Sequence, residues 1–452
     1  MKNNIIYVPI GVPTFHMPSA EAAFKASLAC VKAIVPDIIH PKGILFSTQD
    51  VETFVKAAHP DGIILQHVTF ANAAFATAVF RHSKAPVFLW TLPEPVIDGG
   101  RLRLNSLTGA FSAGHAFKAC HGGYIKHLVG GPDDPQLISS LETFVKAVQA
   151  KADLRHLKLA SIGHPPQGFG FGQAIDTEMA RTFGVELLTI ESRELTQQAR
   201  QLDLNIAEKA SQEAHTKMKG LDTVPTENRD AFIKLYHVYK TYVETHGIKA
   251  IASRCWPDFF TDYGTPVCSV LGLLNDQMVA AACEADAYGA LSMYIGQFLT
   301  GKPTYLGDPV SIDKAENTIT FWHCGTAACS LARADLGAVT GVHPNRQIGP
   351  TMEFGLKPGK KATLFRVGRL PDGTFRFFIA KAEILDKPQQ FLGTSLVAKV
   401  GPPVEKLINM LVTDGWEPHF VVLYDDVSEA LIDLAGMLGL PVITPKECKQ
   451  HG

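Results

Sequence analysis

The sequence lacks both a strong net charge and a paired-cysteine motif. Its 452 residues carry 42 basic and 44 acidic side chains, a formal net charge of −2. That balance offers no broad electrostatic footprint for nucleic acid. The eight cysteines are spread through the chain without a C-x-x-C pair, which argues against a disulfide scaffold and a zinc knuckle. We expect most of them to be small buried hydrophobic residues.

Long apolar runs are missing too. No stretch approaches the roughly 20 residues that a membrane-spanning helix needs. The apolar run Ile5–Ile10 is short and contains Pro9, so it indicates a buried strand rather than a signal peptide. We therefore expect a soluble, cytoplasmic protein without a membrane or nucleic-acid partner.

The length favours two or three domains. Short apolar segments, such as the predicted strands 5–10 and 43–46, alternate with helical ones at the start of the chain, and the pattern restarts near residue 150 with a predicted strand at 158–162. Such alternation is typical of parallel sheets covered by helices. After residue 300, turn-linked strands dominate, and a helix is predicted at 428–438. The predicted architecture is two α/β domains, flavodoxin-like or Rossmann-like, at 1–150 and 151–280, followed by a β-rich C-terminal domain at 281–452.

Three acidic residues are candidates for chemistry. Asp258 follows the predicted strand 249–253, and loops after such strands handle ligands in open α/β sheets. Glu284 and Asp286 lie in a stretch of small apolar residues, where buried carboxylates need a cation or hydrogen-bond partners. A divalent metal would provide this. Capping of the helix that begins here is an equally good explanation.

Two histidines border predicted strands. His419 directly precedes the strand 420–424, where a metal could be held in a defined position; a strand-end surface histidine is the competing interpretation. His323 ends a strand at a glycine turn and could orient a substrate hydroxyl, or could be a packed core residue.

Further polar residues lie in predicted loops. The segment 167–172 is rich in glycine and follows His164, but its spacing matches neither the dinucleotide fingerprint nor the Walker loop. We expect it to be a flexible loop over a polar ligand. In the first domain, the polar residues of 101–105 alternate along one face, which suits hydroxyl or carboxylate recognition or an exposed edge strand. The residues that we predict to contact substrate are Gln66, Trp90, Arg101, Arg103, His164 and His323.

The order of these motifs resembles the L-fucose/L-arabinose isomerase superfamily, and in particular its shorter, fucose-isomerase-like branch. The most specific piece is Cys283-Glu-Ala-Asp286-Ala-Tyr-Gly, and the least specific is the lone histidine of Pro418-His419. The other matching segments are Cys255-Trp-Pro-Asp258, Gly296–Gly301, His323-Cys-Gly325, Arg101–Ser106 and Gly163–Phe169.

The resemblance implies a homo-oligomer, with a hexamer as the expected size, that interconverts aldoses and ketoses with a divalent cation. That cation is usually Mn²⁺, with Mg²⁺ or Co²⁺ as alternatives. By position, Asp286 and His419 match metal ligands of the family, and Asp258 falls where the family has a glutamate. We expect Asp258, Asp286 and His419 to bind the metal, and the two aspartates to share proton transfer through an enediol. Glu284 is expected to have a supporting role.

The sequence does not identify which sugar is the substrate. A pentose or hexose fits, and so does a deoxy- or sulfo-sugar, since spare arginines or histidines could pair with an anionic group. Two alternatives remain. One is a sugar-binding or regulatory protein that has lost catalysis, and the other is a metal-dependent epimerase or aldolase.

Overall fold

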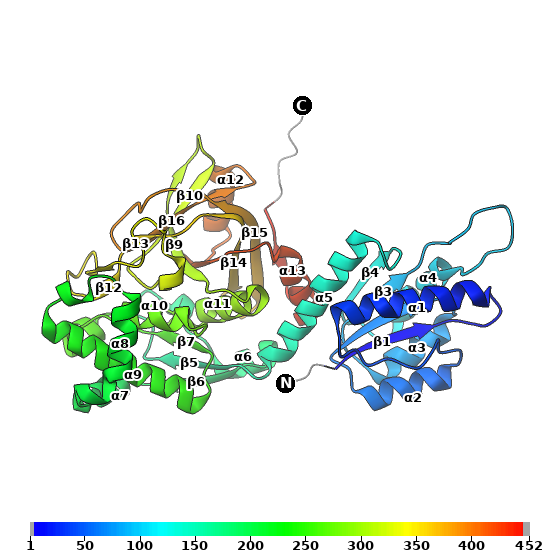
Figure 1. The fold of residues 1–452 in the computed structure, drawn as a ribbon, viewed down its shortest axis with the longest axis horizontal. Coiled ribbons are helices and arrows are strands. Elements are labelled where there is room, and N and C mark those ends of the chain that lie inside the picture. Colours follow the sequence, from blue (N-terminus) through cyan, green and yellow to red (C-terminus); the bar gives the residue numbers. More distant parts are fainter. Residues whose placement is uncertain (1–3, 446–452) are drawn as a thin grey trace. The chain divides into compact units, whose positions relative to one another are not determined.

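A computed structural model of the protein describes residues 4–445, so Cys448 lies outside the described residues. The chain divides into two compact units. Residues 1–153 with 429–439 form unit 1, and residues 154–428 with 440–452 form unit 2 (Figure 1). No helix in the described range is both long and apolar enough to span a lipid bilayer.

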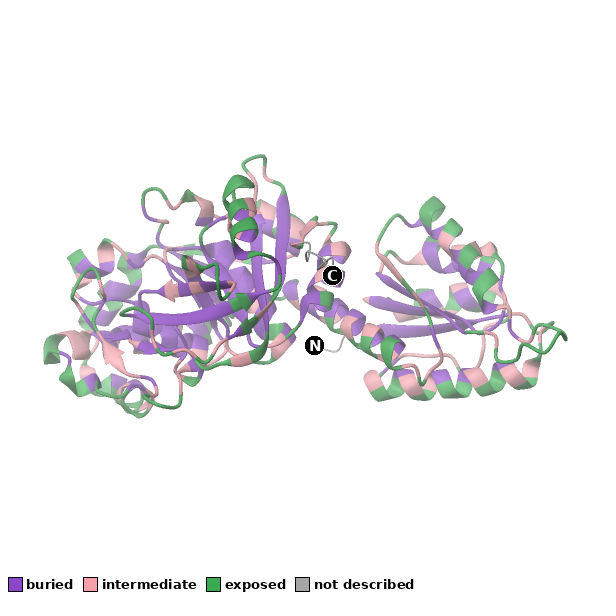
Figure 2. Cartoon of the chain, turned by 90° about the horizontal axis from the view of Figure 1, so that it is seen from above, coloured by how far each residue is buried: buried purple, intermediate pink, exposed green. Residues whose placement is uncertain are grey.

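Unit 1 is built on a parallel sheet in the order β1-β2-β3-β4. All residues of β1, β2 and β3 are buried, as is usual for strands covered by helices on both faces, and Figure 2 draws them in the buried colour. The elements of unit 1 are β1 (Ile5–Ile10), α1 (Met17–Ile34), α2 (Thr48–Ala58), β2 (Gly62–His67), α3 (Ala73–His82), β3 (Val87–Thr91), α4 (Ser106–Cys120), β4 (Ile125–Val129), α5 (Pro135–Leu154) and, from the other end of the chain, α13 (Ser428–Leu438).

An irregular segment extends this sheet beyond β1. The segment 43–46, predicted as a strand, is not a regular one, but Leu45 and Ile39 form isolated parallel bridges to Ile10 and Ile6 of β1. Their backbone groups bond to β1, for example Leu45 N–H to Pro9 C=O at 2.9 Å. The apolar pattern therefore correctly predicted that this segment lies at the sheet. Regular pairing is interrupted because Pro41 and Gly43 disrupt the strand.

Unit 2 begins with a second parallel sheet, in the order β6-β5-β7-β8. Its strands are β5 (Lys158–Ile162), β6 (Glu186–Ile190), β7 (Ala250–Ser253) and β8 (Ala280–Ala282). Its helices are α6 (Asp176–Phe183), α7 (Ser192–Gln201), α8 (Glu208–Lys217), α9 (Thr226–His246) and α10 (Cys268–Asp276). Because β6 and β7 lie on opposite sides of β5, the winding of the chain reverses between β5 and β7. Ligands bind at such switch points in open α/β sheets.

The β-rich part of unit 2 closes into a barrel. In the order β16-β10-β9-β17-β14-β15 each strand pairs with its neighbour, and β15 pairs again with β16. All six pairings are antiparallel. The strands are β9 (Tyr305–Asp313), β10 (Thr318–His323), β14 (Gly359–Arg369), β15 (Phe375–Ile384), β16 (Thr394–Val400) and β17 (Phe420–Leu423), with α12 (Val404–Thr413) following β16.

One helix packs between the parallel sheet and the barrel. This is α11 (Ala287–Thr300), which contacts β5, β7 and β8 on one side and β9, β14 and β17 on the other. It is buried along most of its length, which explains why its sequence is apolar around its whole circumference.

The mixed α/β class with parallel sheets and a β-rich sheet agrees with the prediction. The predicted boundary at 150 lies near the end of the first segment of unit 1. The predicted boundary at 280 falls at β8, which pairs with β7 of the second parallel sheet. The division into three domains stays a prediction.

Candidate functional site

The candidate site lies where the second parallel sheet meets the barrel. The turn between β8 and α11 supplies two carboxylates, Glu284 and Asp286. The barrel supplies Asp308 from β9, His323 from the end of β10, Arg366 from β14 and His419 from just before β17. Residues from two sheets thus converge on one spot.

The turn that carries the carboxylates has an unusual backbone. Glu284 and Ala285 both have positive φ angles, 57° and 54°, a conformation that costs a non-glycine residue about 1–3 kcal/mol and is common at functional sites. The turn is held by Ala285 N–H to Ser253 C=O and Asp286 N–H to Cys283 C=O, at 3.0 and 3.1 Å. Both acidic side chains consequently reach the same imidazole, that of His419.

Asp286 has all its acceptor positions occupied. Its side chain caps α11 by accepting the Gly289 N–H at 2.8 Å. Arg366 donates to both oxygens, at 2.5 and 3.0 Å, and His419 Nδ1 lies 2.8 Å from Oδ2. A Cβ at Gly289 would lie 2.6 Å from Oδ2, so only glycine allows this close approach. Asp286 and Arg366 are both completely buried.

The second nitrogen of His419 faces a group of atoms without hydrogen-bond partners. Its Nε2 lies 2.9 Å from Glu284 Oε2 and 3.6 Å from Asp308 Oδ1. His323 Nε2 lies 3.8 Å from the same Glu284 oxygen. Glu284 Oε2, His323 Nε2 and His419 Nε2 are buried, and none of them is aligned in a hydrogen bond. The three lie within 4.8 Å of one another, a spacing that one cation could bridge.

The charges in this cluster shift one another's titration. Burial lowers the pKa of His419, but Asp286 and Glu284 outweigh it and raise the pKa to about 10. Burial raises the pKa of Glu284, but His323 and His419 lower it to about 2. The pKa of Asp308 is raised by burial. Concentrated pKa perturbation of this kind is typical of functional sites.

Aromatic rings form a wall beside His419. Phe169 and Phe171, from the glycine-rich segment after β5, have ring centroids 6.5 and 5.6 Å from that of His419. Trp256 packs edge-on against Phe169 at 6.0 Å, and the guanidinium of Arg346 lies 5.3 Å from the Trp256 ring. A Cβ at Gly172 would lie 2.8 Å from Asp286 Cα. The segment predicted to lie over a polar ligand therefore packs directly against this site.

Asp258 lies after β7, as predicted, and bonds to other residues. Its Oδ2 accepts the Ser192 hydroxyl at 3.1 Å and lies 3.2 Å from Arg254 Nε. Together with Thr196, Arg200 and other polar residues it lines a cavity of about 820 Å³. The structure thus brings Asp286, His323 and His419 together, and places the Asp258 carboxylate in this polar cavity.

The other predicted contact residues have varied surroundings. In unit 1, Gln66 and Trp90 are fully buried: Gln66 bonds to Tyr7 and Ser27, and Trp90 Nε1 donates to Gly130 C=O at 2.9 Å. Arg101 donates to Thr14 C=O, and Arg103 pairs with Asp98 at 3.3 Å. His164, in unit 2, is exposed.

The sequence did not point to Asp308 and Arg366, and it indicated only a minor role for Glu284. Asp308 and Arg366 lie on barrel strands, and no local pattern says which strands pair. Glu284 was expected only to support the site. A buried arginine within the apolar run Ala362–Val367 was the one available signal for Arg366, because such a charge requires an acidic partner.

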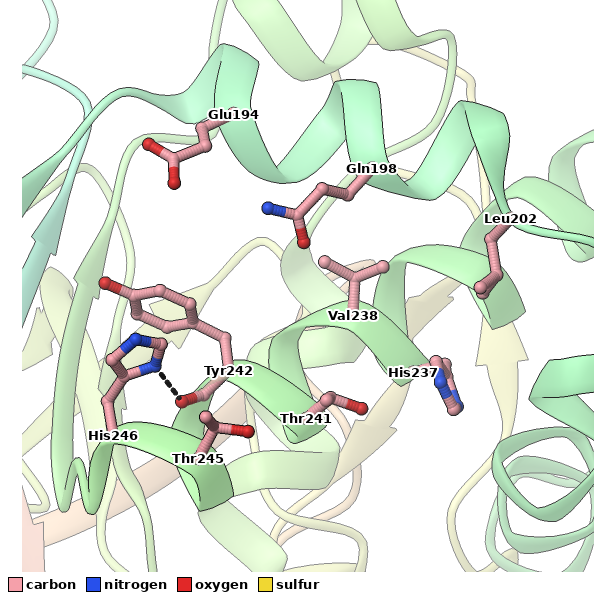
Figure 3. Close-up of a pocket in the computed structure, with 9 residues that line it drawn as sticks. All are labelled: Glu194, Gln198, Leu202, His237, Val238, Thr241, Tyr242, Thr245 and His246. Atoms are coloured by element: carbon pink, nitrogen blue, oxygen red, sulfur yellow. Dashed lines mark hydrogen bonds between the residues drawn. The ribbon is translucent and has the colours of Figure 1, made fainter.

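A separate cavity of about 420 Å³ lies between α7 and α9 (Figure 3). Glu194 and Gln198 of α7, with Leu202 directly after it, face side chains of α9 across it. The His246 imidazole bonds to the Tyr242 C=O at 3.0 Å. No residue of the cluster around His419 lines this cavity.

Comparison with known proteins identifies full-length relatives. A search of protein-family models gives no match. A sulfoquinovose isomerase from Clostridium sp. (strain MSTE9) is 52% identical over 436 residues, covering 96% of this chain and 98% of the relative. Sulfoquinovose isomerases from Priestia aryabhattai and Alkalicoccus urumqiensis are 36% and 35% identical, each over 97% of this chain and 99% and 98% of their own lengths. The chain therefore belongs to the sulfoquinovose isomerase family and is an aldose–ketose isomerase.

Proposed function

We propose that this enzyme converts sulfoquinovose, a glucose derivative with a sulfonate at C6, into the corresponding 2-ketose with the help of a divalent cation. The relatives' names support the substrate and favour an isomerase over a sugar-binding protein, an epimerase or an aldolase. The observation that carries the metal is the convergence of buried atoms of Glu284, His323 and His419 that make no aligned hydrogen bond.

These residues suit a metal such as Mn²⁺, with Mg²⁺ or Co²⁺ as alternatives. Carboxylate oxygens with an imidazole are donors that such ions accept. Because Asp286 holds the Nδ1–H of His419, Nε2 is the nitrogen that faces a cation, and the cation would displace the proton that Nε2 shares with Glu284. We assign Glu284 and His419 as ligands, with Asp308 bordering them, and Asp286 as the residue that orients His419. When bound, the cation offsets negative charge that develops on the sugar oxygens.

The chain must also move a proton between C1 and C2 of the sugar. A base removes the proton at one carbon and returns it at the next. Asp308 is a candidate because its carboxylate is partly exposed and adjoins the cluster. Asp258, the residue predicted from sequence, is the other. We place His323 as the residue that orients a sugar hydroxyl.

The sulfonate requires a cation of its own. Arg346 forms no ion pair with any described residue, and its guanidinium lies over the Trp256 ring. Trp256 packs against Phe169, whose ring in turn lies beside His419. A guanidinium can donate two parallel hydrogen bonds to sulfonate oxygens. We assign Arg346 as the sulfonate-binding residue.

We also propose that the family is a branch of the L-fucose/L-arabinose isomerase superfamily and that the enzyme is a homo-oligomer, with a hexamer as the expected size. Support comes from the order of the sequence motifs. The exposed apolar residues Leu107 and Phe111 of α4, which line an apolar cavity in unit 1, further favour association between copies. Light scattering on the purified protein would measure the size.

The test uses metal-stripped protein in deuterated water with sulfoquinovose or glucose, with and without Mn²⁺. We expect ketose that carries deuterium at C1, detected by NMR, only with metal, and faster formation from sulfoquinovose than from glucose. Sulfoquinovose binding without ketose or deuterium uptake would contradict the proposal. Asp258→Asn and Asp308→Asn identify the base, since the variant that loses deuterium exchange while still binding sugar has lost the proton acceptor.

A further inference from the structure

Four cysteines form a connected group of thiols beside the candidate site. They are Cys255 after β7, Cys268 at the start of α10, Cys283 directly after β8 and Cys324 after β10, each at most 5% exposed. Cys268 Sγ and Cys324 Sγ are 3.8 Å apart. Cys283 Sγ lies within 4.8 Å of Cys324 Sγ and also of Cys255 Sγ. The sequence spacing gave no sign of this group, because its members come from four separate elements.

The separation of one pair of these sulfur atoms suits a soft cation. Zn²⁺ binds thiolates tetrahedrally with bonds of about 2.3 Å, which places two of its sulfur ligands about 3.8 Å apart. Cys268 and Cys324 already have this separation. Thiolates favour Zn²⁺ or Cd²⁺, whereas carboxylates favour Mn²⁺ or Mg²⁺. The thiol group therefore selects a different ion from the carboxylate cluster.

His323 belongs to both groups. Its Nδ1 lies 3.4 Å from Cys324 Sγ, and its Nε2 faces Glu284. An imidazole nitrogen of His323 lies within 4.8 Å of both Cys283 Sγ and Cys324 Sγ. In addition, Cys283 and Cys324 are the sequence neighbours of Glu284 and His323. An ion held by the thiols would therefore pull on residues of the adjacent cluster.

We propose that Cys283, Cys324 and His323, whose ligand atoms lie within 4.8 Å of one another, bind a thiophilic divalent cation such as Zn²⁺, with Cys268 as the fourth ligand, and that this ion inhibits the neighbouring site. On binding, each thiol loses its proton to water and His323 gives a lone pair, so that no electrons are transferred. The proposal that an ion binds here depends only on the geometry of the thiols. The inhibition rests on the proposed function.

Binding is tested on the full chain, kept reduced with a phosphine, by titration with Zn²⁺ and Cd²⁺. We expect one equivalent of Zn²⁺ per chain by metal analysis and, with Cd²⁺, ultraviolet thiolate-to-metal charge-transfer absorption. Cys268→Ser and Cys283→Ser should each weaken binding by roughly tenfold or more, with circular dichroism to verify folding. Cys329→Ser is the matched control, because this thiol contacts Met352 and lies in none of these groups. Unchanged Cd²⁺ absorption in both folded cysteine variants would overturn the site.

Inhibition is tested separately with Mn²⁺-loaded enzyme. We expect the Zn²⁺ concentration that halves turnover to rise roughly tenfold in Cys268→Ser and to stay unchanged in Cys329→Ser. Equal inhibition of both variants would overturn the regulatory part. If the wild type shows thiolate absorption with Cd²⁺ but no turnover of sulfoquinovose with Mn²⁺, the thiol site stands and the proposed function fails.

Discussion

Asp286 is an example of a carboxylate whose partners define its role. Because Arg366, Gly289 and His419 occupy its oxygens, it has no free lone pair directed at a ligand. Glu284, two residues earlier, has a buried oxygen without a hydrogen bond. The two acids of the same turn are therefore suited to different tasks, Glu284 to binding a cation and Asp286 to holding the imidazole.

Replacing each of these acids by its amide should separate the two roles. Asp286→Asn leaves the buried Arg366 with only the more distant Glu417, at 3.9 Å, as a counter-charge. We therefore expect it to lower the free energy of unfolding by about 3 kcal/mol and Mn²⁺ affinity by roughly 10- to 100-fold. Glu284→Gln should abolish Mn²⁺ binding with a much smaller loss of stability. Urea unfolding and calorimetric Mn²⁺ titration measure both quantities. Wild-type Mn²⁺ affinity in Glu284→Gln would exclude it as a ligand.

Arg346 allows a direct test of substrate charge recognition. We expect Arg346→Gln to raise the KM for sulfoquinovose by roughly tenfold or more, because a charge-assisted hydrogen bond contributes about 1.5–3 kcal/mol. Its kcat/KM for glucose, which has no sulfonate, should change little. Arg346→Lys, which keeps the charge but loses the paired donors, should be intermediate. An unchanged KM for sulfoquinovose would place the sulfonate elsewhere.

Residue types in the sequence pointed to part of the cluster. Asp286, His323 and His419 were all singled out, since each interrupts or borders an apolar element. Gln66 and Trp90 were singled out as well; they are buried and bond to Ser27 and Gly130, and their contact with substrate stays a prediction. Sequence alone does not distinguish such pairs from ligand-binding groups. The partners of Asp286 on the barrel depended on strand pairing, which no local pattern contains.

Element by element, the alternation of apolar segments was informative. The predicted strands 5–10 and 158–162 and the predicted helix 428–438 match β1, β5 and α13 residue for residue. The closure of the barrel was not predicted. It depends on the pairing of β15 with β16, and alternation identifies which face of a strand is buried without identifying the neighbouring strand.

Two helices of unit 2 are joined by an ion pair with a defined pH dependence. Lys217 of α8 lies 2.7 Å from Asp276 of α10, and the Ser330 N–H also bonds to Asp276. Burial raises the pKa of Asp276, but these partners outweigh it and lower the pKa below 3.8. A lowered folded-state pKa stabilises the protein above the unfolded-state value, and that contribution disappears as the pH falls through the folded-state pKa.

We therefore expect Asp276→Asn to lower the free energy of unfolding by about 1 kcal/mol at neutral pH. The difference from the wild type should shrink as the pH falls below 3.8. Urea unfolding at a series of pH values measures it, with Glu186→Gln, on a strand edge and paired with Lys158 at 4.0 Å, as the exposed control. A difference independent of pH would show that the charge of Asp276 contributes nothing.

At the scale of the whole molecule, unit 1 is completed by a helix from the far end of the chain. Asp433 of α13 is 2% exposed and accepts hydrogen bonds from Tyr124 at 2.6 Å and Lys126 at 2.8 Å. Lys151 of α5 donates to the Met437 C=O at 2.9 Å. More than 270 residues, 154–428, separate this helix from the rest of unit 1.

Scanning calorimetry on an Asp433→Ala variant tests this attachment. Removing the carboxylate leaves Lys126 half-buried without its partner, which we expect to cost about 3 kcal/mol and to lower the melting temperature of unit 1 by roughly 5–10 °C. The transition of unit 2 should stay in place. Asp425→Ala, which removes an exposed pair with Lys302, is the control. Equal shifts of both transitions would argue against a separate role of α13 in unit 1.

The late position of α13 in the chain has a consequence for biosynthesis. During translation, N-terminal domains usually fold first, as they leave the ribosome. Here the last helix of unit 1 emerges only after all of residues 154–428 have been made. Until then, the nascent unit exposes the surface around Tyr124 and Lys126 that α13 later covers. The first part of the protein to be synthesised is therefore among the last to be finished, and a ribosome that stalls before codon 439 releases an incomplete unit 1.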